Sequence, residues 1–107
     1  MAFDALDIAV ALAAALREPL ARLRQHDKDL ADQARRAANG VALQIAEGRK
    51  RQGRDRLHLW RIAAGSAEEL GTALRLAVAW GYLDPESLRV PRELLDRVLA
   101  MLWRLSH

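Results

Sequence analysis

Cysteine is absent from this chain of 107 residues, which excludes disulfides and thiolate metal sites. The three histidines, His26, His58 and His107, do not share ligand spacing with carboxylates, so the pattern of a metal site is missing as well. The sequence also lacks a glycine-rich phosphate loop and a GxSxG nucleophile motif. These absences predict a protein without a metal or cofactor, and one that is not an enzyme.

Long hydrophobic runs are missing too. The run Ile8–Leu16 is stopped by Arg17 and Glu18, well short of the roughly 20 apolar residues that a membrane span needs. Asp4 and Asp7 precede the run, whereas a signal peptide carries positive charge at that place. We therefore predict a cytoplasmic protein with no membrane partner.

Residues that favour strands are scarce. Val, Ile and Thr together number nine, against 21 Ala and 19 Leu. Small and straight-chain side chains lose little rotamer freedom in a helix, while β-branched ones suit strands. The composition predicts an all-α fold, and the length predicts one domain over residues 1–107 with a single core.

Glycine and proline divide the chain into four predicted helical segments. The first begins near Asp4 and extends to about residue 24, with Pro19 expected to kink or split it. The second begins near residue 27 or 29 and is followed by Gly48. The third runs from about residue 54 to Gly81, and Pro91 lies in the first turn of the last. Short connections favour antiparallel neighbours, which predicts an antiparallel up-down four-helix bundle.

The third segment carries two apolar stripes on different faces. The first has helical 4-3-4-3 spacing and consists of Ala63, Ala67, Leu70, Leu74 and Ala77. The second consists of Leu59, Ile62, Ser66, Ala73, Leu76 and Trp80. One apolar face is enough to cover a bundle core. The second stripe therefore predicts burial against another subunit, and hence a homo-oligomer.

Positive charge is concentrated in the middle of the chain. The segment from Arg35 to Arg61 holds eight of the 17 basic residues and only two acids, Glu47 and Asp55, which gives it a formal charge of +6. The rest of the chain sums to −3, within a total of +3. Fifteen of the basic residues are arginine, which binds phosphates and carboxylates through paired hydrogen bonds. The cluster predicts contact with a polyanion or with another subunit.

Expected exposure divides the polar residues of this region into two groups. Those in the predicted turn form a candidate nucleic-acid-binding site, namely Arg49, Lys50, Arg51, Arg54 and Arg56. Those on the flanking helices are expected to serve subunit or helix packing, namely Arg35, Arg36, Glu47, Ser66 and Glu69. In this interpretation Arg35 and Arg36 would meet acids such as Glu68 and Glu69 across a subunit seam. Phosphate contacts release counterions, so binding at the first group should depend steeply on salt.

A catalytic alternative involves Arg51 and His58. An arginine followed at this distance by a histidine resembles the pair in HEPN-type helical ribonucleases, where the arginine activates a phosphate and the histidine acts as general base. Gly53 is expected to break the helix between them, and an arginine-rich chain produces such spacings easily. A ribonuclease therefore stays an alternative to the non-enzymatic prediction.

Four sequence blocks resemble one known family. They are Gln33-x-Arg35-Arg36-Ala37-Ala38, Ile45-Ala46-Glu47-Gly48, Ile62-Ala63-Ala64-Gly65-Ser66-Ala67-Glu68-Glu69-Leu70 and Gly81-Tyr82-Leu83. At these spacings the chain is similar to the bacterial four-helix-bundle proteins named after rRNA intervening sequences. The resemblance implies a cytosolic bundle assembled into a homopentameric ring. A related branch, the accessory proteins of diversity-generating retroelements, uses a basic surface to bind nucleic acid and a reverse transcriptase.

Two functions follow as expectations. The first is a non-enzymatic, homo-oligomeric bundle that binds structured RNA or DNA through the basic surface. The alternative is a structural or adaptor oligomer that binds a protein partner, for example a reverse transcriptase, with the basic residues serving subunit packing. The residues of the predicted turn would carry the first function, and those of the flanking helices the second.

Overall fold

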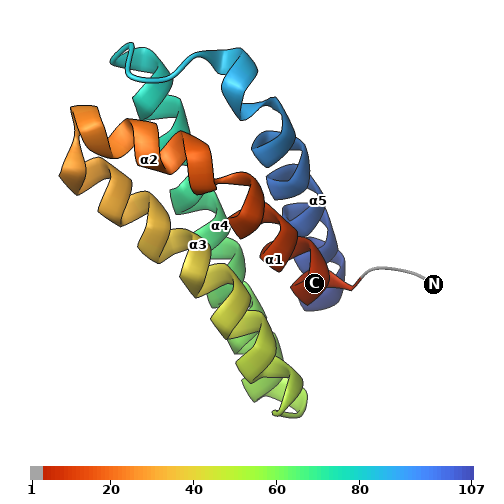
Figure 1. The fold of residues 1–107 in the computed structure, drawn as a ribbon. Helices are drawn as coiled ribbons and strands as arrows, with labels where there is room; N and C mark the ends of the chain where they lie inside the picture. The colour runs from red at the N-terminus through yellow and green to blue at the C-terminus, as the bar shows by residue number, and fades with distance from the viewer. Residues whose placement is uncertain (1–3) are drawn as a thin grey trace.

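The computed structural model describes residues 4–107, and helices make up most of that range (Figure 1). In chain order the elements are α1 (Ala5–Ala15), α2 (Arg17–His26), α3 (Lys28–Arg49), α4 (Gly53–Ala79), the short 3₁₀ helix η1 (Pro85–Leu88) and α5 (Arg89–Ser106). Between residues 4 and 107 there is no strand, so the predicted all-α fold is confirmed. Each helix in this range is too short or too polar to cross a membrane.

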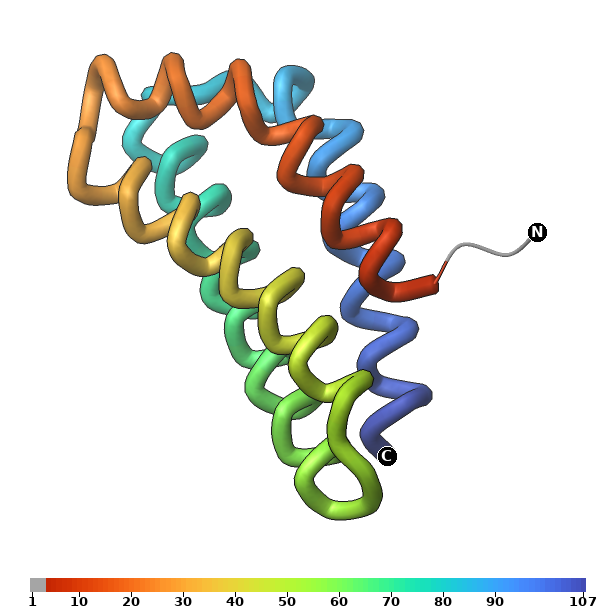
Figure 2. The backbone as a smooth tube through the Cα atoms, turned by 60° about the horizontal axis from the view of Figure 1, so that its bottom comes forward, coloured from red at the N-terminus to blue at the C-terminus, as the bar shows by residue number. Residues whose placement is uncertain are grey.

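The first predicted helical segment is split in two. The α1 helix begins after Asp4, whose carboxylate accepts a hydrogen bond from the Asp7 amide at 3.0 Å in a capping box. It ends before Leu16, and α2 follows with Pro19 in its first turn. Because proline has no amide hydrogen, one backbone bond of a continuous helix is lost at this point. The predicted break is confirmed, and it lets α2 turn toward the start of α3 (Figure 2).

The α3 and α4 helices form a long antiparallel hairpin (Figures 1 and 2). The turn between them contains Gly53, which has a φ of +59°. Glycine reaches this left-handed region without a steric penalty from a side chain. In both views the turn lies beyond the C-terminal end of α5, at the free end of the hairpin.

The end of α4 lies close to Gly81, as the sequence predicted. Gly81 has a φ of +78°, and the Tyr82 amide donates to the Ala77 carbonyl oxygen at 2.9 Å, which closes the helix. The chain then passes through η1 into α5, which has Pro91 in its first turn. The connection between α4 and α5 is therefore partly helical, a detail that its two prolines did not reveal.

Alanine and leucine side chains fill the core between the helices. The first predicted stripe of α4 is buried, namely Ala63, Ala67, Leu70, Leu74 and Ala77. The second stripe is covered only in part. Ala73 is buried and Leu59 and Ser66 are partly buried, whereas Ile62, Leu76 and Trp80 are 39%, 44% and 68% exposed. The predicted need for a partner subunit therefore applies to these three residues.

Candidate nucleic-acid and subunit interfaces

The turn between α3 and α4, called the basic turn below, gathers cations at the free end of the hairpin. Its exposed basic residues are Arg49, Lys50, Arg51 and Arg54. Within residues 4–107, Lys50 and Arg54 form no ion pair. The first amides of α4 also lack a side-chain cap, since Gln52 makes no capping hydrogen bond. Uncapped amides at a helix N-terminus attract anions, so the cations and the helix end favour the same kind of ligand.

Two arginines of the basic turn contact carboxylates of the same chain. Arg49 Nη1 lies 3.2 Å from Asp4 Oδ2, and Arg51 Nη2 lies 2.9 Å from Glu47 Oε1. These four side chains are roughly half exposed, and ion pairs at such sites contribute little because water and salt compete with them. Both arginines can therefore exchange a carboxylate for a phosphate at small cost.

Two carboxylates near the basic turn, Asp4 and Glu47, have lowered pKa values, which gives the first testable prediction. The Asp7 amide lowers the pKa of Asp4 below 3.8, and the hydrogen bond from Arg51 lowers the pKa of Glu47 below 4.5. A carboxylate whose pKa is lower in the folded than in the unfolded chain stabilises the fold at pH values above its unfolded pKa. This stability is lost as the pH falls through the folded pKa. We expect Tm to fall slightly on acidification below about pH 4.5 for this reason. Glu47→Gln should make that fall shallower in circular dichroism melts, and an unchanged pH profile would contradict the assignment.

Arg56 differs from its neighbours because its guanidinium is partly buried. Its Nε and Nη2 atoms donate to the carbonyl oxygens of Gly48 and Arg49, both at 3.2 Å, and so close the C-terminal end of α3. The guanidinium carbon also lies 5.4 Å from the centre of the Trp60 ring. Trp60 Nε1 in turn donates to the Ile45 carbonyl oxygen at 3.3 Å. The structure thus gives Arg56 a capping contact that its exposed neighbours lack.

Ser66 lies where α3 and α4 pack together, and Glu47 lies near the end of α3. Ser66 Oγ donates to Gln44 Oε1 at 3.0 Å across the two helices. A Cβ atom built on Gly40 would lie 3.1 Å from Ser66 Oγ, so the small residues permit this close approach. Glu47 is half-buried one turn further along α3 and is held by Arg51. Ser66 therefore bridges α3 and α4, whereas the hydrogen bonds of Glu47 go to Arg51, four residues along the chain. The packing roles of both residues stay predictions.

Removing the Ser66 hydroxyl should weaken the hairpin. Ser66→Ala leaves the Gln44 amide without its partner, and we expect a loss of about 0.5–1.5 kcal/mol in the free energy of unfolding. Urea unfolding of Ser66→Ala, Gln44→Ala and the double variant measures the coupling between the two side chains. Strictly additive effects would show that the hydrogen bond contributes nothing.

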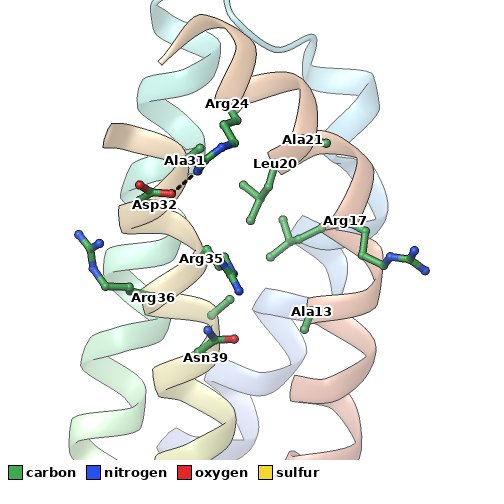
Figure 3. Close-up of a pocket in the computed structure, with 12 residues that line it drawn as sticks. Ala13, Arg17, Leu20, Ala21, Arg24, Ala31, Asp32, Arg35, Arg36 and Asn39 are labelled. Carbon is green, nitrogen blue, oxygen red and sulfur yellow. Dashed lines mark hydrogen bonds and ion pairs between the residues drawn. The ribbon is translucent and has the colours of Figure 1, made fainter. Parts of the chain in front are cut away.

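Arg35 and Arg36 lie on the exposed side of α3, far along the helix from the basic turn. They border a groove of 810 Å³ between α2 and α3, the α2–α3 groove (Figure 3). Arg35 points into the groove, while Arg36 and Arg17 extend outward at its edges. Arg24 is paired with Asp32 at one end. Four arginines against one aspartate give this surface a net charge of +3.

Short and apolar side chains explain why the groove is open. Its lining includes Leu16, Leu20, Ala21, Ala31 and Ala38. The break between α1 and α2 changes the direction of the chain beside these alanines, whose short side chains leave the space into which Arg35 points. Sequence reasoning missed Arg17 and Arg24 as part of this surface. Their spacing of seven residues places them on one face of a helix, and that was the available signal.

Glu69 lies on the uncovered face of α4. Ile62, Leu76 and Trp80 share that face with it at helical spacings, and the four residues are called the α4 stripe below. Glu69 is exposed and forms no ion pair within residues 4–107. A partner surface that is apolar and positively charged could cover these side chains and form an ion pair with Glu69.

The two residues of the ribonuclease alternative are held differently. Arg51 is hydrogen-bonded to Glu47, while His58 is exposed on α4. The positive φ of Gly53 separates the helix that carries His58 from the end of α3. Between residues 4 and 107, the two side chains share no hydrogen-bond partner. The ribonuclease alternative therefore stays a prediction without a direct contact in the described part of the chain to support it.

These features define a class: an all-α protein built on a helical hairpin with a basic turn. The chain belongs to the 23S rRNA-intervening sequence protein family, which it matches over residues 3–104. The predicted resemblance is therefore confirmed.

A crystal structure of a Bacteroides thetaiotaomicron protein of unknown function, from the S23 ribosomal protein family, is similar, with a TM-score of 0.86 and 19% identity. The match covers 95% of this chain and 97% of that one, and at this identity it establishes a shared fold. A comparison with curated proteins found no match.

Proposed function

We propose that this chain is a non-enzymatic, cytoplasmic protein that forms a homo-oligomer and binds structured RNA or DNA through the basic turn. The observation that carries the proposal is the set of exposed cations at the tip of the hairpin, beside the uncapped N-terminus of α4. Phosphate groups are the ligands that such a tip suits best. The family name, which refers to 23S rRNA intervening sequences, supports a nucleic acid as the source of those phosphates.

The proposed architecture is an antiparallel up-down four-helix bundle in which α1 and α2 together form one leg. The other legs are α3, α4 and α5. Five such bundles would form the homopentameric ring that the family resemblance implies. The uncovered α4 stripe supports assembly, because exposed apolar side chains gain free energy when another subunit removes them from water.

A salt titration of the wild-type protein tests the binding proposal. We expect the affinity for a structured RNA hairpin to fall steeply between low and moderate salt, with log K linear in log salt concentration. Fluorescence anisotropy with a labelled hairpin at several salt concentrations gives the slope. Absence of binding at low salt, or an affinity that does not depend on salt, would contradict a phosphate contact.

One observation favours a second candidate function, that of a structural or adaptor oligomer for a protein partner such as a reverse transcriptase. Leu43 is 68% exposed on α3, and Trp80 is 68% exposed on α4. Large apolar residues at such exposure are enriched where proteins meet. An intact oligomer that fails to bind RNA at any salt concentration would favour this function over the first.

A further inference from the structure

Two surfaces of the chain lack a partner and have complementary chemistry. The α2–α3 groove is lined by leucine and alanine side chains together with polar residues that carry a net charge of +3. The α4 stripe is apolar and carries the unpaired Glu69. Neither surface is complementary to a copy of itself, because the groove would bring arginines together and the stripe would bring two carboxylates together. Each is suited to meet the other.

Within the groove, Arg35 is the group available for a carboxylate. It points inward and forms no ion pair among residues 4–107, whereas Arg24 is already held by Asp32. The walls beside it include Leu20 and Ala38, which offer apolar contact but no competing anion. A carboxylate that entered the groove on an apolar helix would meet one free guanidinium in a partly desolvated setting. Arginine suits this task because its planar fork can bind both carboxylate oxygens.

The α4 stripe has the form of such a helix. From Ile62 to Trp80 it extends about 27 Å at 1.5 Å per residue. Glu69 lies between apolar residues on this face, seven residues after Ile62 and seven before Leu76. Insertion of the stripe into the α2–α3 groove would therefore bury apolar side chains on both sides of a single ion pair. The chain's own groove lies between two other helices, so a second copy must supply the groove.

We infer that the α4 stripe of one copy docks in the α2–α3 groove of the next copy, with Glu69 bound to Arg35 of that copy. This inference rests on the homo-oligomer of the proposed function and assigns its contact surfaces. The two surfaces differ, so the contact is head-to-tail: in a pair of copies it leaves the groove of one copy and the stripe of the other free. Repetition of such a contact closes into a ring when the rotation between copies permits it.

Charge reversal at both positions tests the contact. Arg35→Glu and Glu69→Arg are each expected to convert the wild-type oligomer into monomers of 12.0 kDa, measured by size-exclusion chromatography with light scattering. The double variant restores opposite charges at every contact and should recover the wild-type mass. Both residues are exposed, so the folded chain should tolerate the changes, and circular dichroism melts check this. Arg22→Glu, an exposed residue of α2 outside the groove lining, is the matched control and should leave assembly intact.

The outcomes separate this inference from the proposed function. If the wild type is an oligomer and both single variants keep its mass, the contact is wrong while assembly stands. If the single variants dissociate but the double variant does not recover, the direct pairing of Arg35 with Glu69 is wrong. A wild-type dimer would overturn the head-to-tail arrangement, because a two-fold pair either satisfies both stripes and both grooves reciprocally or uses other surfaces, and neither repeats from copy to copy. A wild-type monomer would overturn the contact and the proposed oligomer together, and RNA affinity would then be judged separately at the basic turn.

Discussion

Replacing all four exposed cations of the basic turn by alanine should reduce RNA affinity on the order of 100-fold at moderate salt, because each lost phosphate contact removes a counterion-release term. The variant combines changes at Arg49, Lys50, Arg51 and Arg54. The slope of log K against log salt concentration should fall by roughly 3. Arg56 is left unchanged, since it caps α3 and its removal would disturb the fold. Anisotropy titrations at several salt concentrations measure both quantities.

A charge-matched control decides whether the effect is local. Four exposed arginines elsewhere can be replaced by alanine to give the same change in net charge, namely Arg22, Arg75, Arg92 and Arg97. If general attraction to a positive protein dominates, the two quadruple variants will weaken binding equally. If the basic turn is the site, the control will keep most of the affinity. Equal losses would therefore contradict the proposed site even though binding itself is electrostatic.

Features that depend on local backbone chemistry could be predicted from the sequence. Pro19 broke the first helical segment because a proline in the interior of a helix removes a backbone hydrogen bond and clashes with the preceding turn, whatever the tertiary context. Gly81 ended α4 because only glycine adopts a φ of +78° without strain. The buried stripe of α4 followed from helical periodicity alone, since residues three and four apart share a face.

The hydrogen-bond partners of individual arginines could not be predicted, because those partners come close only in the folded chain. Arg61 belongs to the +6 segment, yet its Nε and Nη2 atoms donate to the Ser106 carbonyl oxygen at 3.2 and 3.0 Å. That oxygen is 45 residues away along the chain and comes near only when α4 packs against α5. Arg56 likewise binds backbone carbonyls that become available where α3 ends. A count of charges in the segment therefore overestimated the number of free cations.

The α2–α3 groove lay beyond sequence reasoning for a related reason. The face shared by Arg17 and Arg24 follows from their spacing, but their position opposite Arg35 depends on the direction that α2 takes after the break. The break itself was predicted, while its angle was not. A surface formed by two helices at an angle has no signature in either helix alone. The sequence predicted acids such as Glu68 and Glu69 as partners of Arg35 and Arg36 across a subunit seam, but it could not predict that Arg35 would point into a groove.

Gly48→Ala should destabilise the protein by about 1–3 kcal/mol through overpacking against Trp60. A Cβ atom at this position would lie 2.6 Å from Trp60 Nε1 and 2.8 Å from Cδ1. The indole cannot move away freely, because Nε1 is hydrogen-bonded to the Ile45 carbonyl oxygen and Arg56 lies over the ring. The gain in helix propensity from Gly to Ala, about 1 kcal/mol, is too small to offset the loss of these contacts. Urea unfolding at one fixed protein concentration measures the change, since assembly would couple to stability.

Gly65→Ala is the matched control for this prediction, because nothing lies within 4 Å of a Cβ atom built at that position of α4. It should stabilise the protein by up to about 1 kcal/mol, the ordinary advantage of Ala over Gly in a helix. Trp60→Leu removes the indole that causes the clash, so Gly48→Ala should cost less in that background than in the wild type. If Gly48→Ala is as stabilising as Gly65→Ala, the indole has room to shift and the end of α3 is not held by Trp60. If it destabilises equally in both backgrounds, the loss arises from something other than contact with this ring.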